Sequence, residues 1–120
     1  MANSVKHYLR LLKAELEDLA DELGIIDARC RERFEGAEIT PYVFQENEAL
    51  LKKEIDSIRK FSKIVDGIDA SLYKNIAELE ADLQARSREL IAHFEEPEAV
   101  FIFLKRKFDK IRTYLETQET

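Results

Sequence analysis

The chain has 120 residues, of which 45% are apolar and 37% are charged, and its formal net charge is −6. This length suits one domain with its own core, and the charged fraction exceeds the usual quarter. The acidic balance disfavours a nucleic-acid-binding protein, which normally presents a basic face to the phosphates. A single cysteine fits a reducing compartment, and no apolar run approaches the roughly 18–20 residues of a membrane span. We therefore expect a cytoplasmic protein without nucleic-acid or membrane partners.

The first helix is predicted over residues 4–35. Its apolar residues recur at alternating steps of four and three: Val5, Leu9, Leu12, Leu16, Leu19, Leu23, Ile26 and Cys30. This 3.5-residue repeat is the seam of helices that pack as in a coiled coil. Gly24 lies within it, where a glycine costs about 1 kcal/mol relative to alanine. The seam keeps its phase through Gly24, which favours one continuous helix; a break at Gly24 is the alternative.

The second helix is predicted over residues 41–66. Gly36 is expected to take the left-handed conformation that ends the first helix. Thr40 and Pro41 form a cap followed by proline at the first helical position. Asn47 occupies a position where the seam would carry an apolar residue. The apolar positions are Phe44, Leu51, Ile55, Ile58, Phe61, Val65 and Ile68.

The third and fourth helices are predicted over residues 70–95 and 98–116. Asp69 is the expected cap of the third helix, and Pro97 ends it because proline disfavours a helical residue before it. The third seam is expected to be interrupted at Arg86 and Ser87. Its apolar positions are Leu72, Ile76, Leu79, Leu83, Leu90 and Phe94, and those of the fourth are Val100, Phe101, Leu104, Phe108, Ile111 and Leu115.

These four helices have short connections, so each must run back along the one before it. The fold predicted is an all-α, antiparallel four-helix bundle with a long, coiled-coil-like first hairpin. Residues 1–120 are expected to form a single helical domain.

The residue pattern does not favour catalysis or metal binding. His7 and His93 lie on different helices, and the Glu89 to His93 spacing of four differs from the spacing of three in di-iron bundles. Cys30 falls on the apolar seam, where a thiol is an inert small hydrophobe. The carboxylates of Glu15–Glu22 follow a solvated helix face. We expect no enzyme activity, no cofactor and no metal site.

The fourth helix is the best candidate for a binding surface. Residues 97–114 carry five cations and two anions, in a chain whose net charge is −6. Ile102 and Phe103 fall outside the main apolar stripe of a helical wheel. We therefore predict a partner-binding site at Ile102, Phe103, Arg106, Lys107 and Lys110, since apolar and aromatic residues beside cations are typical of interfaces. In the alternative interpretation Ile102 is a lone exposed residue, and the cations pair with the acidic first helix.

The first half of the chain resembles the FlgN-like bacterial flagellar export chaperones over residues 5–65. The shared features are a Leu/Glu-rich first helix, a turn near Gly36, and the Asn47-Glu48 step before Leu50 and Leu51 in the second helix. This resemblance implies a cytoplasmic chaperone that holds secreted hook–filament junction proteins. In that family the C-terminal helical region engages the client, which here corresponds to Val100–Leu115. The strong stripe of this segment is typical of a packed helix, so a packed and a mobile segment both stay open.

The sequence thus predicts a non-enzymatic helical interaction protein. The concrete hypothesis is an export chaperone that holds an amphipathic helix of a secreted client in a groove. The alternative is a homo-oligomeric scaffold, such as a homodimer, whose long helices complete their seams against a second copy. A bundle enzyme or metal sensor is the third and least favoured class.

Overall fold

The computed structural model describes the backbone of residues 2–94 and 98–119 and the side chains of residues 4–92 and 100–117. These ranges contain four α-helices, one 3-10 helix and no strand. The elements are α1 (Ala2–Glu35), α2 (Pro41–Asp66), η1 (Ala70–Leu72), α3 (Ile76–Phe94) and α4 (Glu98–Glu119). The prediction of an all-α helical bundle is confirmed.

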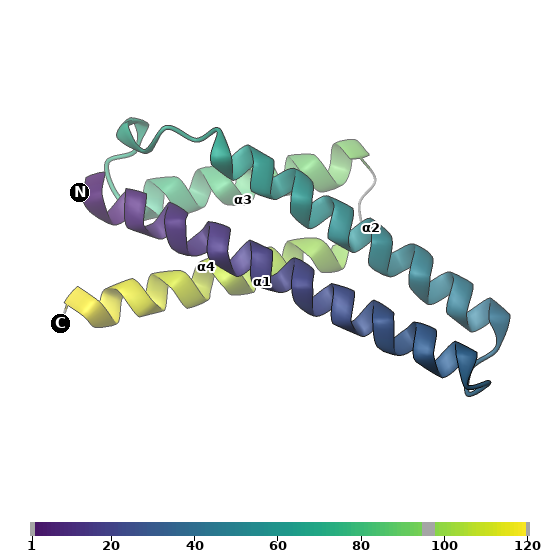
Figure 1. The fold of residues 1–120 in the computed structure, drawn as a ribbon. Coiled ribbons are helices and arrows are strands. Elements are labelled where there is room, and N and C mark those ends of the chain that lie inside the picture. Colours follow the sequence, from purple (N-terminus) through teal and green to yellow (C-terminus); the bar gives the residue numbers. More distant parts are fainter. Residues whose placement is uncertain (1, 95–97, 120) are drawn as a thin grey trace.

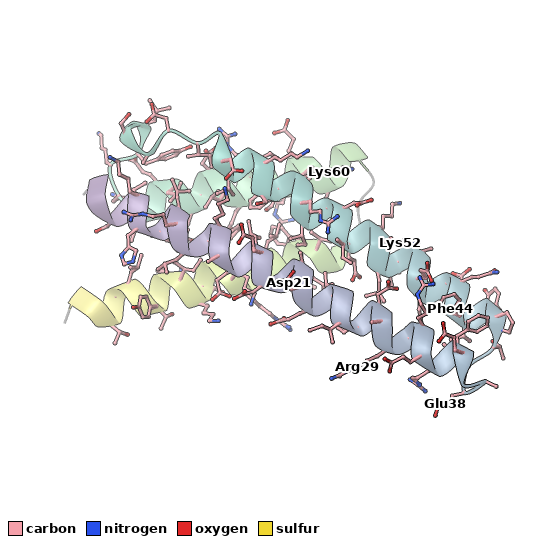
Figure 2. The ribbon with its side chains drawn as sticks, viewed as in Figure 1. Asp21, Arg29, Glu38, Phe44, Lys52 and Lys60 are labelled. Atoms are coloured by element: carbon pink, nitrogen blue, oxygen red, sulfur yellow. The ribbon has the colours of Figure 1, made fainter. Side chains whose placement is uncertain are left out.

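Helices α1 and α2 form a long hairpin, and α3 and α4 lie against only part of it (Figure 1). The turn between α1 and α2 projects at the end of the molecule opposite the N-terminus. Figure 2 shows Arg29, Glu38 and Phe44 near this end. The molecule measures 54 × 32 × 18 Å, so it is elongated along the hairpin. We call residues 24–54 the projecting half of the hairpin.

Helix α1 is continuous through Gly24, and the alternative of a break there is wrong. Gly24 is exposed, and a Cβ added to it would meet no atom within 4 Å. The seam residues from Val5 to Leu23 face the core, although Leu9 is only half-buried. Ile26 is 49% exposed where the projecting half begins, while Cys30, the last residue of the predicted seam, is buried. Tyr8 is fully buried and was not on the predicted seam.

The residue that reverses the chain after α1 is Ala37, and the expectation of a left-handed Gly36 is wrong. Ala37 has φ 59°, while no glycine among the described residues has a positive φ. The Ala37 N–H donates to the Phe34 carbonyl (3.0 Å), and the Glu38 N–H donates to the Arg33 carbonyl (2.8 Å). These two bonds form a Schellman motif, whose left-handed position is one residue beyond the helix cap. Gly36 therefore lies one residue before the left-handed position that a glycine usually occupies in this motif.

The start of α2 agrees with the sequence. The Thr40 hydroxyl accepts a hydrogen bond from the Val43 N–H at 3.2 Å, and Pro41 occupies the first turn. At the other end, the Gly67 N–H bonds the Ile64 carbonyl and closes the helix.

The third helix begins at Ile76, and the predicted start at residue 70 is wrong. Asp69 caps η1, in which its carboxylate accepts from the Ser71 N–H at 3.0 Å. Asn75 is the cap of α3: its side chain accepts from the Glu78 N–H at 2.9 Å, and the Glu78 carboxylate accepts from the Lys74 N–H. This arrangement is close to a capping box, except that the Glu78 carboxylate takes the N–H of the residue before the cap. Leu72, predicted for the core, is therefore 74% exposed.

The core joins all four helices, and the rings of Phe61 and Phe108 lie 6.0 Å apart in it. Ser87 is fully buried in line with Leu83 and Leu90, so the expected interruption of the third seam is wrong at this position. The Ser87 hydroxyl is satisfied by the Gln84 carbonyl at 2.8 Å, which allows the polar residue inside. Arg86 is exposed, as the pattern indicated. The side chains of His93 and Phe94 lie outside the described residues.

Candidate partner-binding site

The main apolar stripe of α4 belongs to the core. Its buried residues recur at steps of three and four: Val100, Leu104, Phe108, Ile111 and Leu115. This stripe is the face of an amphipathic helix packed against its neighbours. Of the two open interpretations, the structure places α4 as a packed helix. The site predicted from the sequence therefore has to lie on the flanks of the stripe.

Four of the five predicted site residues lie together in a groove between α1 and α4. The groove has a volume of about 320 Å³ and is lined by Leu19, Glu22, Leu23, Ile26, Phe103, Arg106, Lys107 and Lys110. Phe103 is half-buried against the core. The floor is thus apolar, and three cations of α4 form one wall. We call this the α1–α4 groove.

Two of these cations are already engaged within the chain. Lys110 Nζ lies 2.9 Å from one Glu15 oxygen, and Lys107 Nζ lies 3.1 Å from the other. The hydrogen bond from Lys110 is the main reason why the pKa of Glu15 lies below its usual range. Glu15 was predicted to lie on a solvated face, but its side chain is only 20% exposed. At this point the acidic first helix pairs with the basic fourth helix, as in the alternative interpretation. Arg106 forms no ion pair with any described residue.

Ile102, the fifth predicted site residue, is 49% exposed and lies outside the lining of the α1–α4 groove. It is four residues before Arg106, so the two side chains share one outer face of α4. The structure therefore brings Phe103 and the three cations together in one groove. Ile102 lies at the edge of that surface rather than inside the groove.

A second and larger groove lies on the projecting half and was not predicted. It has a volume of about 710 Å³ and is lined by Ile26, Arg29, Cys30, Arg33, Ile39, Val43, Asn47, Leu50, Leu51 and Glu54. We call it the hairpin-end groove. It shares Ile26 with the α1–α4 groove, so the two surfaces are continuous along α1. Asn47, noted as a polar residue at an apolar position, lies here with its amide 3.9 Å from the Cys30 sulfur.

Glu54 is the most unusual residue of the hairpin-end groove. Its side chain is on the groove lining, yet the residue is only 6% exposed. No described cation forms an ion pair with it, and burial raises the pKa of its carboxyl. The sequence offered no signal for this, since Glu54 sits in a mixed-charge stretch that is typical of a solvated face.

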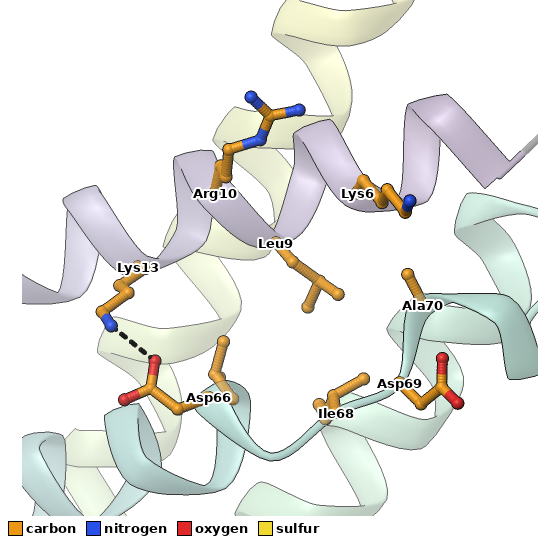
Figure 3. Close-up of a pocket in the computed structure, with 9 residues that line it drawn as sticks. Lys6, Leu9, Arg10, Lys13, Asp66, Ile68, Asp69 and Ala70 are labelled. Atoms are coloured by element: carbon orange, nitrogen blue, oxygen red, sulfur yellow. Dashed lines mark ion pairs between the residues drawn. The ribbon is translucent and has the colours of Figure 1, made fainter.

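A third cavity, of about 530 Å³, lies where α1 crosses the turn after α2 (Figure 3). Lys6, Arg10 and Lys13 line it together with Asp66 and Asp69. Lys13 reaches Asp66 at 2.7 Å, while Arg10 points away from the turn in the close-up. The charges of this cavity are nearly balanced, so it fits an element of the fold better than a charged ligand.

A buried polar cluster links α1, α3 and α4. Glu80 is buried, and its Oε2 accepts from Arg112 at 3.1 Å. Burial raises the pKa of Glu80 despite the neighbouring guanidinium. The Tyr8 hydroxyl donates weakly to the Phe108 carbonyl at 3.4 Å, and burial also raises the pKa of Tyr8. This cluster is a structural contact, because breaking a buried pair leaves an uncompensated charge.

Within the described ranges, no three His, Cys, Asp or Glu side chains gather where they could hold a metal ion. None of the described helices is long and apolar enough to cross a membrane. Comparison of the chain with protein-family models, curated proteins and solved structures finds no match.

Proposed function

We propose that this protein is a non-enzymatic helical interaction protein that holds an amphipathic helix of a partner in the α1–α4 groove. The observation that supports this most is the groove itself, with Phe103 in its floor and Arg106, Lys107 and Lys110 along one wall. Grooves with apolar floors commonly accept the apolar face of a helix.

The partner helix would bury its apolar face on Leu23, Ile26 and Phe103. Acidic residues on one flank of that helix would meet Arg106 first, because Arg106 has no competing carboxylate among the described residues. Lys107 and Lys110 would exchange part of their interaction with Glu15 for the partner, at a modest cost. Ile102 would add apolar contact at the outer edge. The proposal therefore assigns the affinity to Phe103 and the orientation to the cations.

The resemblance to FlgN-like proteins supports a more specific form of the proposal. In this form the protein is a cytoplasmic chaperone of bacterial flagellar export, and its client is a secreted protein. The client would be held through an amphipathic helix until it is exported. This form rests on the first half of the chain and on the placement of the candidate site in the C-terminal helix.

The alternative function is a homo-oligomeric scaffold without a client. The exposed apolar residues of the projecting half favour it, because Ile25, Ile26 and Leu50 are each about half exposed. Two copies that packed there would complete their seams. Light scattering on the purified chain separates the two functions, since a stable dimer at micromolar concentration favours the scaffold.

The test of the proposed function compares the wild type with the Ile102→Ala/Phe103→Ala double variant. Partners are captured from the native host, and the identified client is then added to the purified chain. The client should raise the melting temperature of the wild type by mass action, and much less that of the double variant. Leu72→Ala is the matched control, because Leu72 is an exposed leucine far from the groove. Equal recovery and equal stabilisation with both variants would rule out the α1–α4 groove.

A further inference from the structure

The hairpin-end groove exists because the hairpin is longer than the helices that cover it. Along α1 the groove runs from Ile26 to Arg33, and along α2 from Val43 to Glu54. The second span is about 16 Å, or three helical turns. Leu50 is 49% exposed within it, although it lies among the apolar residues that face the groove. The groove thus continues the helix-packing surface of the bundle with no helix upon it.

The shape of the groove indicates what covers it. Its two walls are helices, and the space between them is concave, as between neighbouring helices of a bundle. A single helix presents the convex surface that fills such a space. A second copy of this chain is the competing occupant, but each copy carries a net charge of −6, which opposes self-association.

Glu54 indicates the charge of the occupant on the α2 side. Burial raises the pKa of its carboxyl, so the charged form is disfavoured unless a cation lies beside it. Lys52 and Arg31, two cations of this region, both contact Glu48 instead, at 2.7 and 3.1 Å. A cation supplied by the occupant would satisfy Glu54 and would exclude the remaining water from it.

The α1 side of the groove carries the opposite charge. Arg29 forms no ion pair with a described residue, and Arg33 makes only an exposed contact of 3.4 Å with Glu38. The two arginines are four residues apart, so they lie on one face of α1. The groove therefore has a basic edge on α1 and an acidic residue at the edge on α2, with apolar residues between them.

We propose that the hairpin-end groove is a docking site for an amphipathic helix of another protein that carries acidic residues along its α1-facing edge and a basic residue opposite Glu54. This site shares Ile26 with the α1–α4 groove but is otherwise lined by different residues, and it does not require that the proposed function be correct. The charge pattern determines which edge of the partner helix lies against α1 and which lies against α2. It also discriminates against helices whose charges are reversed.

The experiment uses the full chain and two synthetic helical peptides of about fourteen residues, or four turns. Both peptides carry a leucine face and glutamates on one edge. One peptide has a lysine at the centre of the other edge, and the second has the uncharged norleucine there. The affinity of each labelled peptide is measured by fluorescence anisotropy. The lysine peptide should bind the wild type at least about tenfold more tightly.

Three variants locate the binding. Glu54→Gln should bring the ratio of the two affinities close to one. Glu46→Gln, which changes an exposed carboxylate of the same helix, is the control and should leave the ratio unchanged. Leu50→Asp should abolish binding, whereas Leu72→Asp should leave it unchanged. Circular dichroism melts show that each variant is folded; Leu50 and Leu72 are exposed enough to accept the change.

Four outcomes would overturn the proposal. The first is that neither peptide binds, and the second is that Glu54→Gln does not change the ratio of the two affinities. The third is that Phe103→Ala abolishes peptide binding while Leu50→Asp does not affect it. The fourth is that the free chain forms a dimer that Leu50→Asp dissociates. The third outcome assigns the peptide to the α1–α4 groove, so it would support the proposed function while refuting the hairpin-end site. The fourth assigns the groove to a second copy.

Discussion

Replacing Glu54 by glutamine should stabilise the free protein, because it removes a buried carboxylate that has no described cation partner. A fully buried polar group without a partner costs about 1–3 kcal/mol, but the Glu54 oxygens keep some contact with solvent and bear only part of that cost. We therefore expect a gain of about 0.5 kcal/mol near neutral pH. For a chain of this length the gain raises the melting temperature by roughly 2 °C.

The pH dependence of this gain identifies its cause. Burial raises the pKa of Glu54 in the folded state, so the folded chain binds the proton more tightly than the unfolded chain. The contribution of Glu54 to the wild type's stability is therefore fully present below the pKa of Glu54 in the unfolded chain. It is lost as the pH rises through the pKa of Glu54 in the folded chain. Glu54→Gln removes that loss, and each pKa unit corresponds to about 1.4 kcal/mol.

Urea unfolding at about pH 3 and about pH 7.5 measures the effect, on either side of the ordinary glutamate range. The difference between Glu54→Gln and the wild type should be near zero at the lower pH and should reach its full size at the higher pH. Glu46→Gln, an exposed change on the same helix, should show no such trend. An equal difference at both values, or a loss of stability at neutral pH, would mean that Glu54 has a partner and that our reasoning is wrong.

Three further variants test the fold. Ala37→Gly should raise the unfolding free energy by about 1 kcal/mol, because alanine is strained at a positive φ, and Gly36→Ala should have little effect; the reverse order would exclude Ala37 as the left-handed residue. Gly24→Ala should stabilise by a similar amount in thermal melts, since the new methyl group meets no atom, and destabilisation would indicate a kink in α1. Phe108→Ala should cost about 3–5 kcal/mol because it opens a cavity beside Phe61, and a loss below 1 kcal/mol would place Phe108 outside the core.

The sequence predicts well where a long periodic signal repeats itself. The seam of α1 extends over seven steps, and one exposed glycine does not change its phase. The continuous helix was therefore predicted correctly. The Thr40-Pro41 start of α2 was equally clear, because a cap and a proline coincide. The start of α3 was predicted too early because Asp69 is a good cap by residue type. Asn75 was missed, although it is followed three residues later by Glu78, whose carboxylate accepts from the Lys74 N–H.

The candidate site was predicted only in part, for a physical reason. Periodicity shows which face of a helix is apolar, and this correctly separated Phe103 from the core stripe of α4. It does not show where a neighbouring helix ends. Ile26 lies on the predicted seam of α1, yet it is exposed because α3 and α4 do not extend over the projecting half. Glu54 was missed for the converse reason, since a charged residue among other charges gives no sign of burial.

The projecting half is held together differently from the rest of the molecule. Its contacts between α1 and α2 include the stacked rings of Phe34 and Phe44, with centroids 4.4 Å apart, and the exposed pair of Arg31 and Glu48. Exposed ion pairs add little stability, and a hairpin of two helices buries only one side of each. Evolution towards stability alone would shorten such a hairpin or replace Glu54 with an apolar residue. A long hairpin with an open apolar groove and a buried acid is what a protein would retain if a partner helix completes the bundle.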